Sequence, residues 1–202
     1  MKRLLLLLLI CFPIAAITQS LKKEVKEHRK EYKADFLKEE RSPFYNKKEE
    51  LKLLRFFKPK KKYRVACTFT LTPESETFDM ATYSGMLKKY RKYGTLEFTI
   101  KGQTHQLAVY QSLMLIKMDG YRDYLFLPFK DLTNDKSTYG GGRYINLKTG
   151  DIKDGKVTLD FNKNYNPYCA FSGGYNCPIP PKENHLGIAI KAGEKKFAGE
   201  AH

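Results

Sequence analysis

Hydrophobic and polar residues alternate in several short segments after residue 62, with the period of two that indicates half-buried β-strands. The clearest run is 63–71, in which Tyr, Val, Cys, Phe and Leu share one face. The strands expected on this basis are 63–71, 77–82, 95–100, 103–110, 123–129, 143–147, 156–162 and 186–190. Because turn residues separate these short segments and no strand–helix rhythm is present, we predict a mainly β protein, a small antiparallel β-barrel or sandwich-like domain.

Turn signals pair four of these strands into two hairpins. Strands 95–100 and 103–110 are joined by a Lys-Gly step, a short connection that is typical of a hairpin. Strands 143–147 and 156–162 flank a connection rich in turn residues, and we expect them to pair in the same way. Cys67 lies on the apolar face of its strand, which predicts a buried thiol.

The N-terminal part of the chain carries a helical pattern instead. Its apolar residues recur at helical spacing at Leu21, Val25, Tyr32 and Phe36. A second helix is expected after a Ser-Pro break, with Asn46 as N-cap, Glu49 completing a capping box, and a stripe of Leu51, Leu54 and Phe57. We therefore predict two N-terminal helices in a basic arm, residues 19–61. The arm would cover an open sheet edge of a single β domain, residues 62–198.

Residues 1–18 have the pattern of a secretory signal peptide. Lys2 and Arg3 form its charged region, an apolar run follows, and small residues favour cleavage before Gln19. A lipoprotein anchor at Cys11 is the alternative, although Ile10 stands where such a signal has a small residue. We expect an exported protein, periplasmic or extracellular, whose mature form has no membrane span, because the apolar run is too short.

The chain is strongly basic, with 37 Lys and Arg against 22 Asp and Glu and a net charge of +15. Much of the excess precedes Arg64 and lies in the predicted arm. Such a surface attracts anionic partners, but no nucleic-acid-binding module is recognisable, and export argues against nucleic acid. A solvated basic face is the simpler interpretation, and docking of the arm on an anionic envelope surface is the functional one.

Polar residues that could form a binding site gather in the last third of the chain. A Gly-rich turn leads into Arg143, whose guanidinium suits a carboxylate or phosphate, and Asp160 and Asn162 share one face of a strand. The predicted pocket is formed by Tyr139, Arg143, Asp160, Asn162, Asn166, Glu183, Asn184 and His185. We expect it to bind a small, anionic ligand with Arg143 as the charge partner, although glycines before a strand are also ordinary turn residues.

Cys169 and Cys177 bracket a Gly-Gly turn, and in an exported protein such a pair predicts a disulfide. Two other interpretations stay open. The cysteines could bind a metal together with His185, or one of them could be a nucleophile with His185 as its base. A hydrolase that uses Asp160 or Glu183 with His185 is a further alternative. The sequence identifies no cofactor.

A set of short motifs carries a resemblance to a known family. They are Ser42-Pro43-Phe44, Gly94 to Phe98, Tyr139 to Tyr144, Leu159 to Asn162, Tyr165-Asn166-Pro167, Cys169-Ala170, Cys177-Pro178, Pro180-Pro181, Glu183-Asn184, Leu186 and Ala192-Gly193-Glu194. On these residues the chain resembles the bacterial and archaeal family called domain of unknown function 1684. The resemblance implies no particular activity. Similar proteins without export signals also carry the cysteine pair, which implies a purpose beyond a disulfide and favours the metal or reactive-thiol interpretation somewhat.

Overall fold

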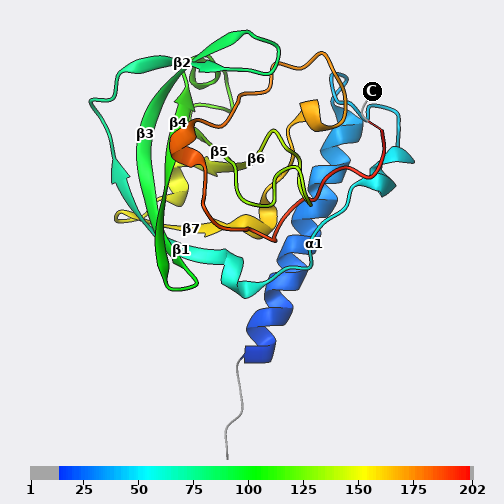
Figure 1. The fold of residues 1–202 in the computed structure, drawn as a ribbon, viewed down its shortest axis with the longest axis horizontal. Helices are drawn as coiled ribbons and strands as arrows, with labels where there is room; N and C mark the ends of the chain where they lie inside the picture. Colours follow the sequence, from blue (N-terminus) through cyan, green and yellow to red (C-terminus); the bar gives the residue numbers. More distant parts are fainter. Residues whose placement is uncertain (1–13, 201–202) are drawn as a thin grey trace, which may run out of the picture.

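The computed structural model describes residues 14–200, with side chains from residue 19 onward. The protein is mainly β, as predicted, and its strands form one antiparallel sheet that curls into a half-barrel (Figure 1). The strands are β1 (Arg64–Leu71), β2 (Thr77–Ala81), β3 (Leu87–Ile100), β4 (Gln103–Ser112), β5 (Tyr124–Phe129), β6 (Arg143–Lys148) and β7 (Lys156–Asp160). Their order is β6-β5-β4-β3-β1-β7, and β2 pairs with the first half of β3.

The main hydrophobic core fills the inside of the curl. Alternate residues of every long strand point into it, as Leu125 and Leu127 of β5 and Leu107 of β4 do. Each of these three side chains is fully buried, which stabilises the fold by roughly 1.5–3 kcal/mol per side chain. The intervening residues of the same strands, such as Phe126, face outward and form a separate aromatic cluster on the outer face.

Strand β3 contains a β-bulge between Lys92 and Gly94, an irregularity that bends a strand locally. A Cβ at Gly94 would lie 2.3 Å from the ring of Phe69, so only glycine fits this close approach of β3 to β1. The hairpin of β3 and β4 is confirmed. Its turn uses Lys101 and Gly102, both with positive φ, as a tight hairpin turn requires.

The second predicted hairpin is wrong. β6 pairs with β5 and β7 pairs with β1, so these two strands form opposite edges of the sheet. Their connection explains why they diverge. A short 3-10 turn, Thr149–Asp151, follows β6, and the Asp151 carboxylate accepts the backbone N–H of Lys148, which a paired strand would otherwise use.

The prediction of a last strand at 186–190 is also wrong, because this segment forms no β-strand. Its backbone bonds to the loop after β5 instead, with Leu186 N–H donating to Lys130 O and Leu132 N–H donating to Ile188 O. Because these bonds reach a loop and no strand, they do not extend the ladder. Leu186 and Ile190 are nevertheless buried in the main core.

The arm contains one α-helix among the described residues, α1 (Ile14–Lys38), and the expectation of two helices is wrong. The second segment forms only a 3-10 turn, Glu50–Leu53. Asn46 has a φ of 57°, whereas an N-cap residue adopts an extended backbone, so the expected capping box does not form. The apolar residues of this segment still pack, in a second cluster of Phe36, Phe44, Leu51, Leu54, Ala170, Phe171 and Phe197.

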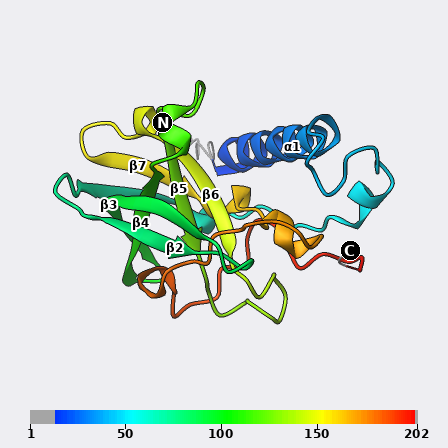
Figure 2. The same cartoon turned by 90° about the horizontal axis from the view of Figure 1, so that it is seen from above.

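Helix α1 lies alongside the half-barrel and extends beyond it at its N-terminal end (Figures 1 and 2). Its contacts are polar as well as apolar: Glu24 bonds Arg64 of β1, and Arg29 donates to the carbonyl of Phe57. Residues 1–13 of the predicted signal peptide lie outside the described residues, and α1 runs across the predicted cleavage position before Gln19. Among residues 14–200, no helix has the length and apolar character needed to cross a membrane.

Candidate ligand pocket

A pocket of about 300 Å³ lies on the outer face of the sheet, and we call it the tyrosine pocket. Its volume is at the lower end of the range found for small-molecule sites. Its aromatic lining consists of Tyr90, Tyr124, Phe126, Tyr144, Tyr165, Tyr168 and Tyr175. Lys88, Pro167 and the segment 176–178 complete the wall.

The floor of the tyrosine pocket is formed by aromatic side chains that point to the outer face of the sheet. Tyr90 of β3, Phe126 of β5 and Tyr144 of β6 lie on the face opposite to the main core. The ring of Phe126 meets Tyr144 edge-on, with ring centroids 4.8 Å apart, which is a favourable aromatic geometry. The remaining wall comes from the irregular segment 165–178, which lies over these strands.

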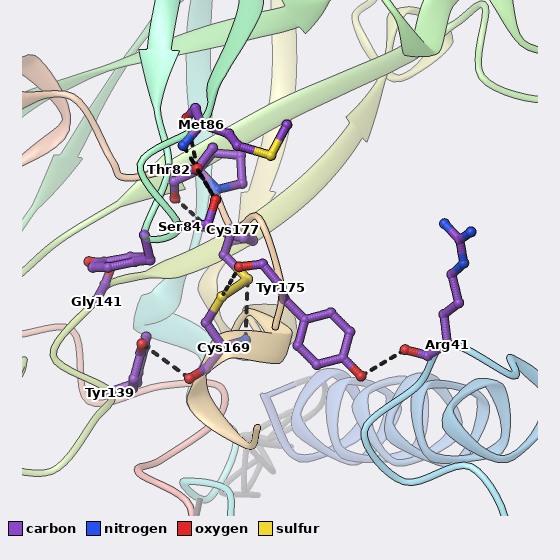
Figure 3. The surroundings of a disulfide bond; sticks show 12 residues. Arg41, Thr82, Ser84, Met86, Tyr139, Gly141, Cys169, Tyr175 and Cys177 are labelled. Atoms are coloured by element: carbon purple, nitrogen blue, oxygen red, sulfur yellow. Dashed lines mark hydrogen bonds between the residues drawn. A yellow bond between two sulfur atoms is a disulfide. The ribbon is translucent and has the colours of Figure 1, made fainter. Parts of the chain in front are cut away.

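A disulfide between Cys169 and Cys177 closes that segment into a loop (Figure 3). The loop is also tied to its surroundings on two sides. Cys177 O accepts the backbone N–H of Tyr83, and the Tyr175 hydroxyl donates to Arg41 O in the arm, 2.8 Å away. The tyrosine pocket therefore has one wall that is covalently closed and hydrogen-bonded to both the arm and the turn between β2 and β3.

Most of the tyrosine hydroxyls around the pocket already donate hydrogen bonds to the protein. Tyr124 and Tyr165 both donate to Asn146 Oδ1, at 2.9 and 2.6 Å, and Tyr144 donates to Pro178 O. Burial raises the pKa of Tyr90 to about 12 and raises the pKa of Tyr144 well above its usual value. These rings therefore present uncharged aromatic surface at neutral pH.

Lys88 supplies the one cationic side chain of the pocket lining. It is half-buried, and this loss of hydration lowers the pKa of its ammonium group. Within the described part of the chain it makes no ion pair or hydrogen bond, whereas its neighbour Lys89, on the other face of β3, pairs with Asp79 at 2.8 Å. A half-buried cation without a partner is stabilised by an anion, so the pocket favours a negatively charged group.

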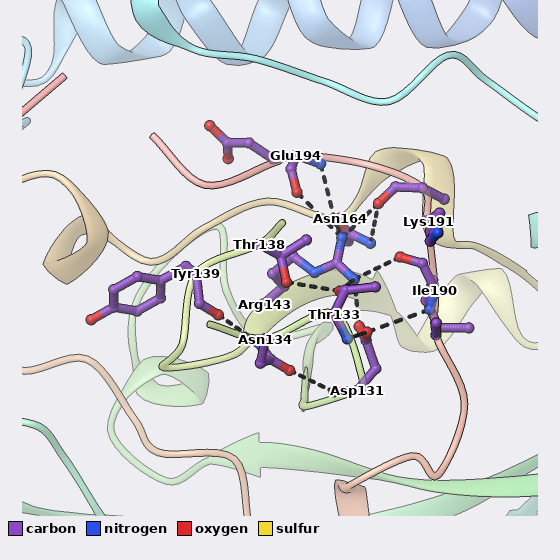
Figure 4. A network of polar contacts seen from close by, with 12 residues as sticks. Asp131, Thr133, Asn134, Thr138, Tyr139, Arg143, Asn164, Ile190, Lys191 and Glu194 are labelled. Atoms are coloured by element: carbon purple, nitrogen blue, oxygen red, sulfur yellow. Dashed lines mark hydrogen bonds and ion pairs between the residues drawn. The ribbon is translucent and has the colours of Figure 1, made fainter. Parts of the chain in front are cut away.

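Arg143, the predicted charge partner, lies elsewhere and has no exposed surface. Its guanidinium pairs with Asp131 and donates to Asn164 and to the backbone carbonyls of Ile190 and Ala192 (Figure 4). These groups come from three separate loops. Arg143 thus holds the loops together in the described structure, and both terminal nitrogens of its guanidinium are directed at protein atoms.

The other predicted site residues lie in several separate surroundings. Asp160 and Asn162 bond each other, Asp160 also pairs with Arg64, and Asn162 contacts the backbone of Lys60. Asn166 donates its backbone N–H to Glu194. The structure therefore does not bring the eight predicted residues into one pocket.

Three more of the predicted residues, Glu183, Asn184 and His185, belong to the loop after Pro180. Glu183 accepts from Tyr110 and pairs with Lys92, both at 2.6 Å. Asn184 is fully buried and bonds the backbone of Ala108 in β4.

His185 contacts Pro180 O through Nε2. Asp160, Glu183 and His185 are thus bonded to three different sets of groups, and no bond links any two of them within residues 14–200. Tyr139, the last of the predicted residues, donates to Cys169 O behind the disulfide. The described residues also contain no cluster of three or more His, Cys, Asp and Glu that could hold a metal.

Sequence reasoning missed most of the tyrosine pocket. The chain has 14 tyrosines, and several fall on the polar-facing positions of strands, which is a signal for an aromatic outer face. Of the cysteine pair, Cys177 lies in the pocket wall. Nothing in the sequence distinguishes Lys88 from the many other lysines, because the pocket that it lines is completed by the distant segment 165–178.

The chain matches a known protein family over most of its length. The family described as "Protein of unknown function (DUF1684)" matches residues 49–195, which include the whole tyrosine pocket. The chain belongs to this family.

A solved structure is similar to the chain in both sequence and fold. The solution NMR structure of an uncharacterized protein from gene locus rrnAC0354 of Haloarcula marismortui is similar, with 33% sequence identity and a TM-score of 0.67. The alignment covers 90% of this chain and 97% of the archaeal one. No curated protein matches the sequence.

Proposed function

We propose that this DUF1684 protein binds a small ligand with a flat, largely apolar body and an anionic group in the tyrosine pocket. The observation that carries the proposal is the unpaired, half-buried Lys88 at the edge of an aromatic cavity. The rings of the lining contact the body of the ligand, and Lys88 pairs with its anionic group. The anionic ligand expected from the sequence is retained, with Lys88 in place of Arg143 as its charge partner.

Export remains part of the proposal. The disulfide between Cys169 and Cys177 supports it, because such bonds persist mainly in oxidising compartments. The ligand would then be met outside the cytoplasm. Fractionation of the source cells tests this point directly: mature protein in the periplasm or medium supports export, and full-length protein confined to the cytoplasm contradicts it.

The binding site is tested with two fluorescent probes of the same shape and different charge. 1-Anilinonaphthalene-8-sulfonate is flat, aromatic and anionic, and N-phenyl-1-naphthylamine is its neutral counterpart. We expect the native protein to bind both, and Lys88→Met to weaken binding of the sulfonate about fivefold to tenfold while leaving the neutral probe unchanged, because only the charge pair is removed. Lys88→Arg should retain most of the sulfonate affinity.

Lys89→Met is the matched control, since this neighbour is exposed and points to the other face of β3. It should leave both probes unaffected. Equal sulfonate binding by the wild type and Lys88→Met would contradict the role of Lys88. The proposed binding pocket would be contradicted if the native protein bound neither probe and native mass spectrometry detected no retained ligand.

A further inference from the structure

The half-barrel is open between its two edge strands, and a cleft of about 550 Å³ lies there, which we call the edge cleft. Ile145, Asn146 and Leu147 of β6 form one side, Val157 and Thr158 of β7 form the other, and α1 contributes its rim. Its apolar lining is mainly aliphatic, from Ile145, Leu147 and Val157, whereas the lining of the tyrosine pocket is mainly aromatic.

Backbone register shows which way the edge of β6 points. Tyr144 exchanges two backbone hydrogen bonds with Tyr165, at 2.9 and 3.0 Å, so its N–H and C=O face away from β5. In an antiparallel pair this direction repeats every second residue. Asn146 therefore also directs its backbone N–H and C=O away from β5, toward the cleft, and neither group has a partner among the described residues.

The same argument applies to β7. Lys156 exchanges backbone bonds with Lys153 in the turn before the strand, at 2.8 and 2.9 Å, so its groups face away from β1. Thr158, two residues on, shares this direction. The bond from Phe69 N–H to Gly155 O confirms that the odd-numbered residues are the ones that face β1. Thr158 thus presents a free donor and a free acceptor to the cleft.

We propose that the edge cleft binds an extended acidic peptide segment, which adds a strand to the free edge of β7 and lies against Asn146 of β6. The backbone groups of Thr158 and Asn146 supply the hydrogen bonds, as in other cases of strand addition. Leu147 and Val157 offer apolar surface to alternate side chains of the peptide. The occupant closes the curl that the seven strands leave open.

The charge of the occupant follows from the rim. Lys153 lies in the turn before β7 and Lys156 is its first residue, next to the cleft residues Val157 and Thr158; both lysines are exposed, and neither makes an ion pair within residues 14–200. Of the charged residues that line the cleft, Arg64 is paired with Glu24 and Asp160, and Lys163 is paired with Glu24. The carboxylate of Asp151, also in the lining, accepts the backbone N–H of Lys148. Free positive charge at the rim complements acidic side chains of a bound strand. Lysines also protect sheet edges from pairing with other chains, and the experiment below separates the two roles.

The probe is a short fluorescent peptide of alternating valine and glutamate, blocked at both ends, and binding to the full chain is followed by fluorescence anisotropy. Thr158→Pro removes the donor that faces the cleft and leaves the ladder to β1 intact, because that N–H does not point to β1. We expect about tenfold weaker binding by this variant, and unchanged binding by Thr158→Val, which retains the N–H.

Two further measurements keep the test independent of how Thr158→Pro folds. The wild-type Thr158 amide should exchange its hydrogen more slowly when the peptide is bound. A peptide methylated on alternate backbone nitrogens, with the same side chains, should bind the wild type about tenfold more weakly. Unchanged exchange at Thr158, equal affinity of the methylated peptide, or equal affinity of a peptide with glutamine for glutamate would each overturn the proposal.

Discussion

The hydroxyl of Tyr32, on α1, donates a hydrogen bond to Oε2 of Glu194, 2.9 Å away, and joins the helix to the C-terminal segment. Glu194 is fully buried, and the same oxygen accepts the backbone N–H of Asn166 at 2.8 Å. Burial raises the pKa of Glu194 to about 8 against the pull of these bonds and of nearby Arg143. The carboxyl is therefore largely protonated at neutral pH.

We expect the free energy of unfolding to fall as pH rises from about 4.5 to about 8. In this window Glu194 is ionised in the unfolded chain but protonated in the folded one, so raising the pH favours unfolding. The full effect is on the order of 4–5 kcal/mol. Glu194→Gln, which stays neutral, should remove most of this slope, as urea unfolding at several pH values within the window would show.

Glu183→Gln is the control for this experiment. Its hydrogen bonds with Lys92 and Tyr110 lower the pKa of Glu183 despite partial burial, so its contribution is lost only at more acidic pH. It should leave the slope above about pH 5 unchanged. A Glu194→Gln variant with the wild-type slope would mean that another group titrates.

Replacement of Arg143 by lysine should cost about 3–5 kcal/mol of stability. The guanidinium bonds Asp131, Asn164 and several carbonyls in different directions, and an ammonium group cannot reach them all. Chemical denaturation measures the loss. Arg122→Lys, which alters an exposed pair with Asp119, should change stability by less than about 0.5 kcal/mol. A stable Arg143→Lys protein would show that the loops hold together without it.

Removal of the disulfide should affect both stability and the tyrosine pocket. Opening the loop between Cys169 and Cys177 by a double Cys→Ser substitution is expected to cost about 2.5 kcal/mol, from the entropy of a short loop. Because Cys177 and Tyr175 lie in the pocket wall, sulfonate probe affinity should fall as well. Reduced wild-type protein should behave like the variant, and full probe affinity in both would mean that the wall is held by noncovalent contacts.

Local patterns in the sequence predicted most of the strands, because a period of two reflects which side chains face the core. They did not predict all of the pairing. The segment 149–155 has the composition of a hairpin turn, but Asp151 caps the end of β6 and sends β7 to the far edge of the sheet. The prediction of a second helix is wrong for a similarly local reason. Asn46 has a left-handed backbone, and the spacing of apolar residues gives no information about this conformation.

The candidate site was harder to predict, because its chemistry depends on contacts between distant segments. Arg143 has the composition of a ligand-binding residue, yet carbonyls from residues 190 and 192 surround it. Lys88 has no distinctive sequence context, and it lines the pocket together with residues of the distant segment 165–178. Charge and polarity identify residues that need partners, and the tertiary fold decides whether those partners are protein or ligand.

Asn146 lines the edge cleft and is hydrogen-bonded to two tyrosines of the tyrosine pocket. Its side-chain oxygen accepts hydrogen bonds from the hydroxyls of Tyr124 and Tyr165, while its backbone N–H and C=O face the edge cleft. A peptide that shifts this residue alters the position of both rings, so the two sites are linked through one amino acid. Linkage between binding equilibria is reciprocal: whatever factor the peptide imposes on ligand affinity, the ligand must impose on peptide affinity.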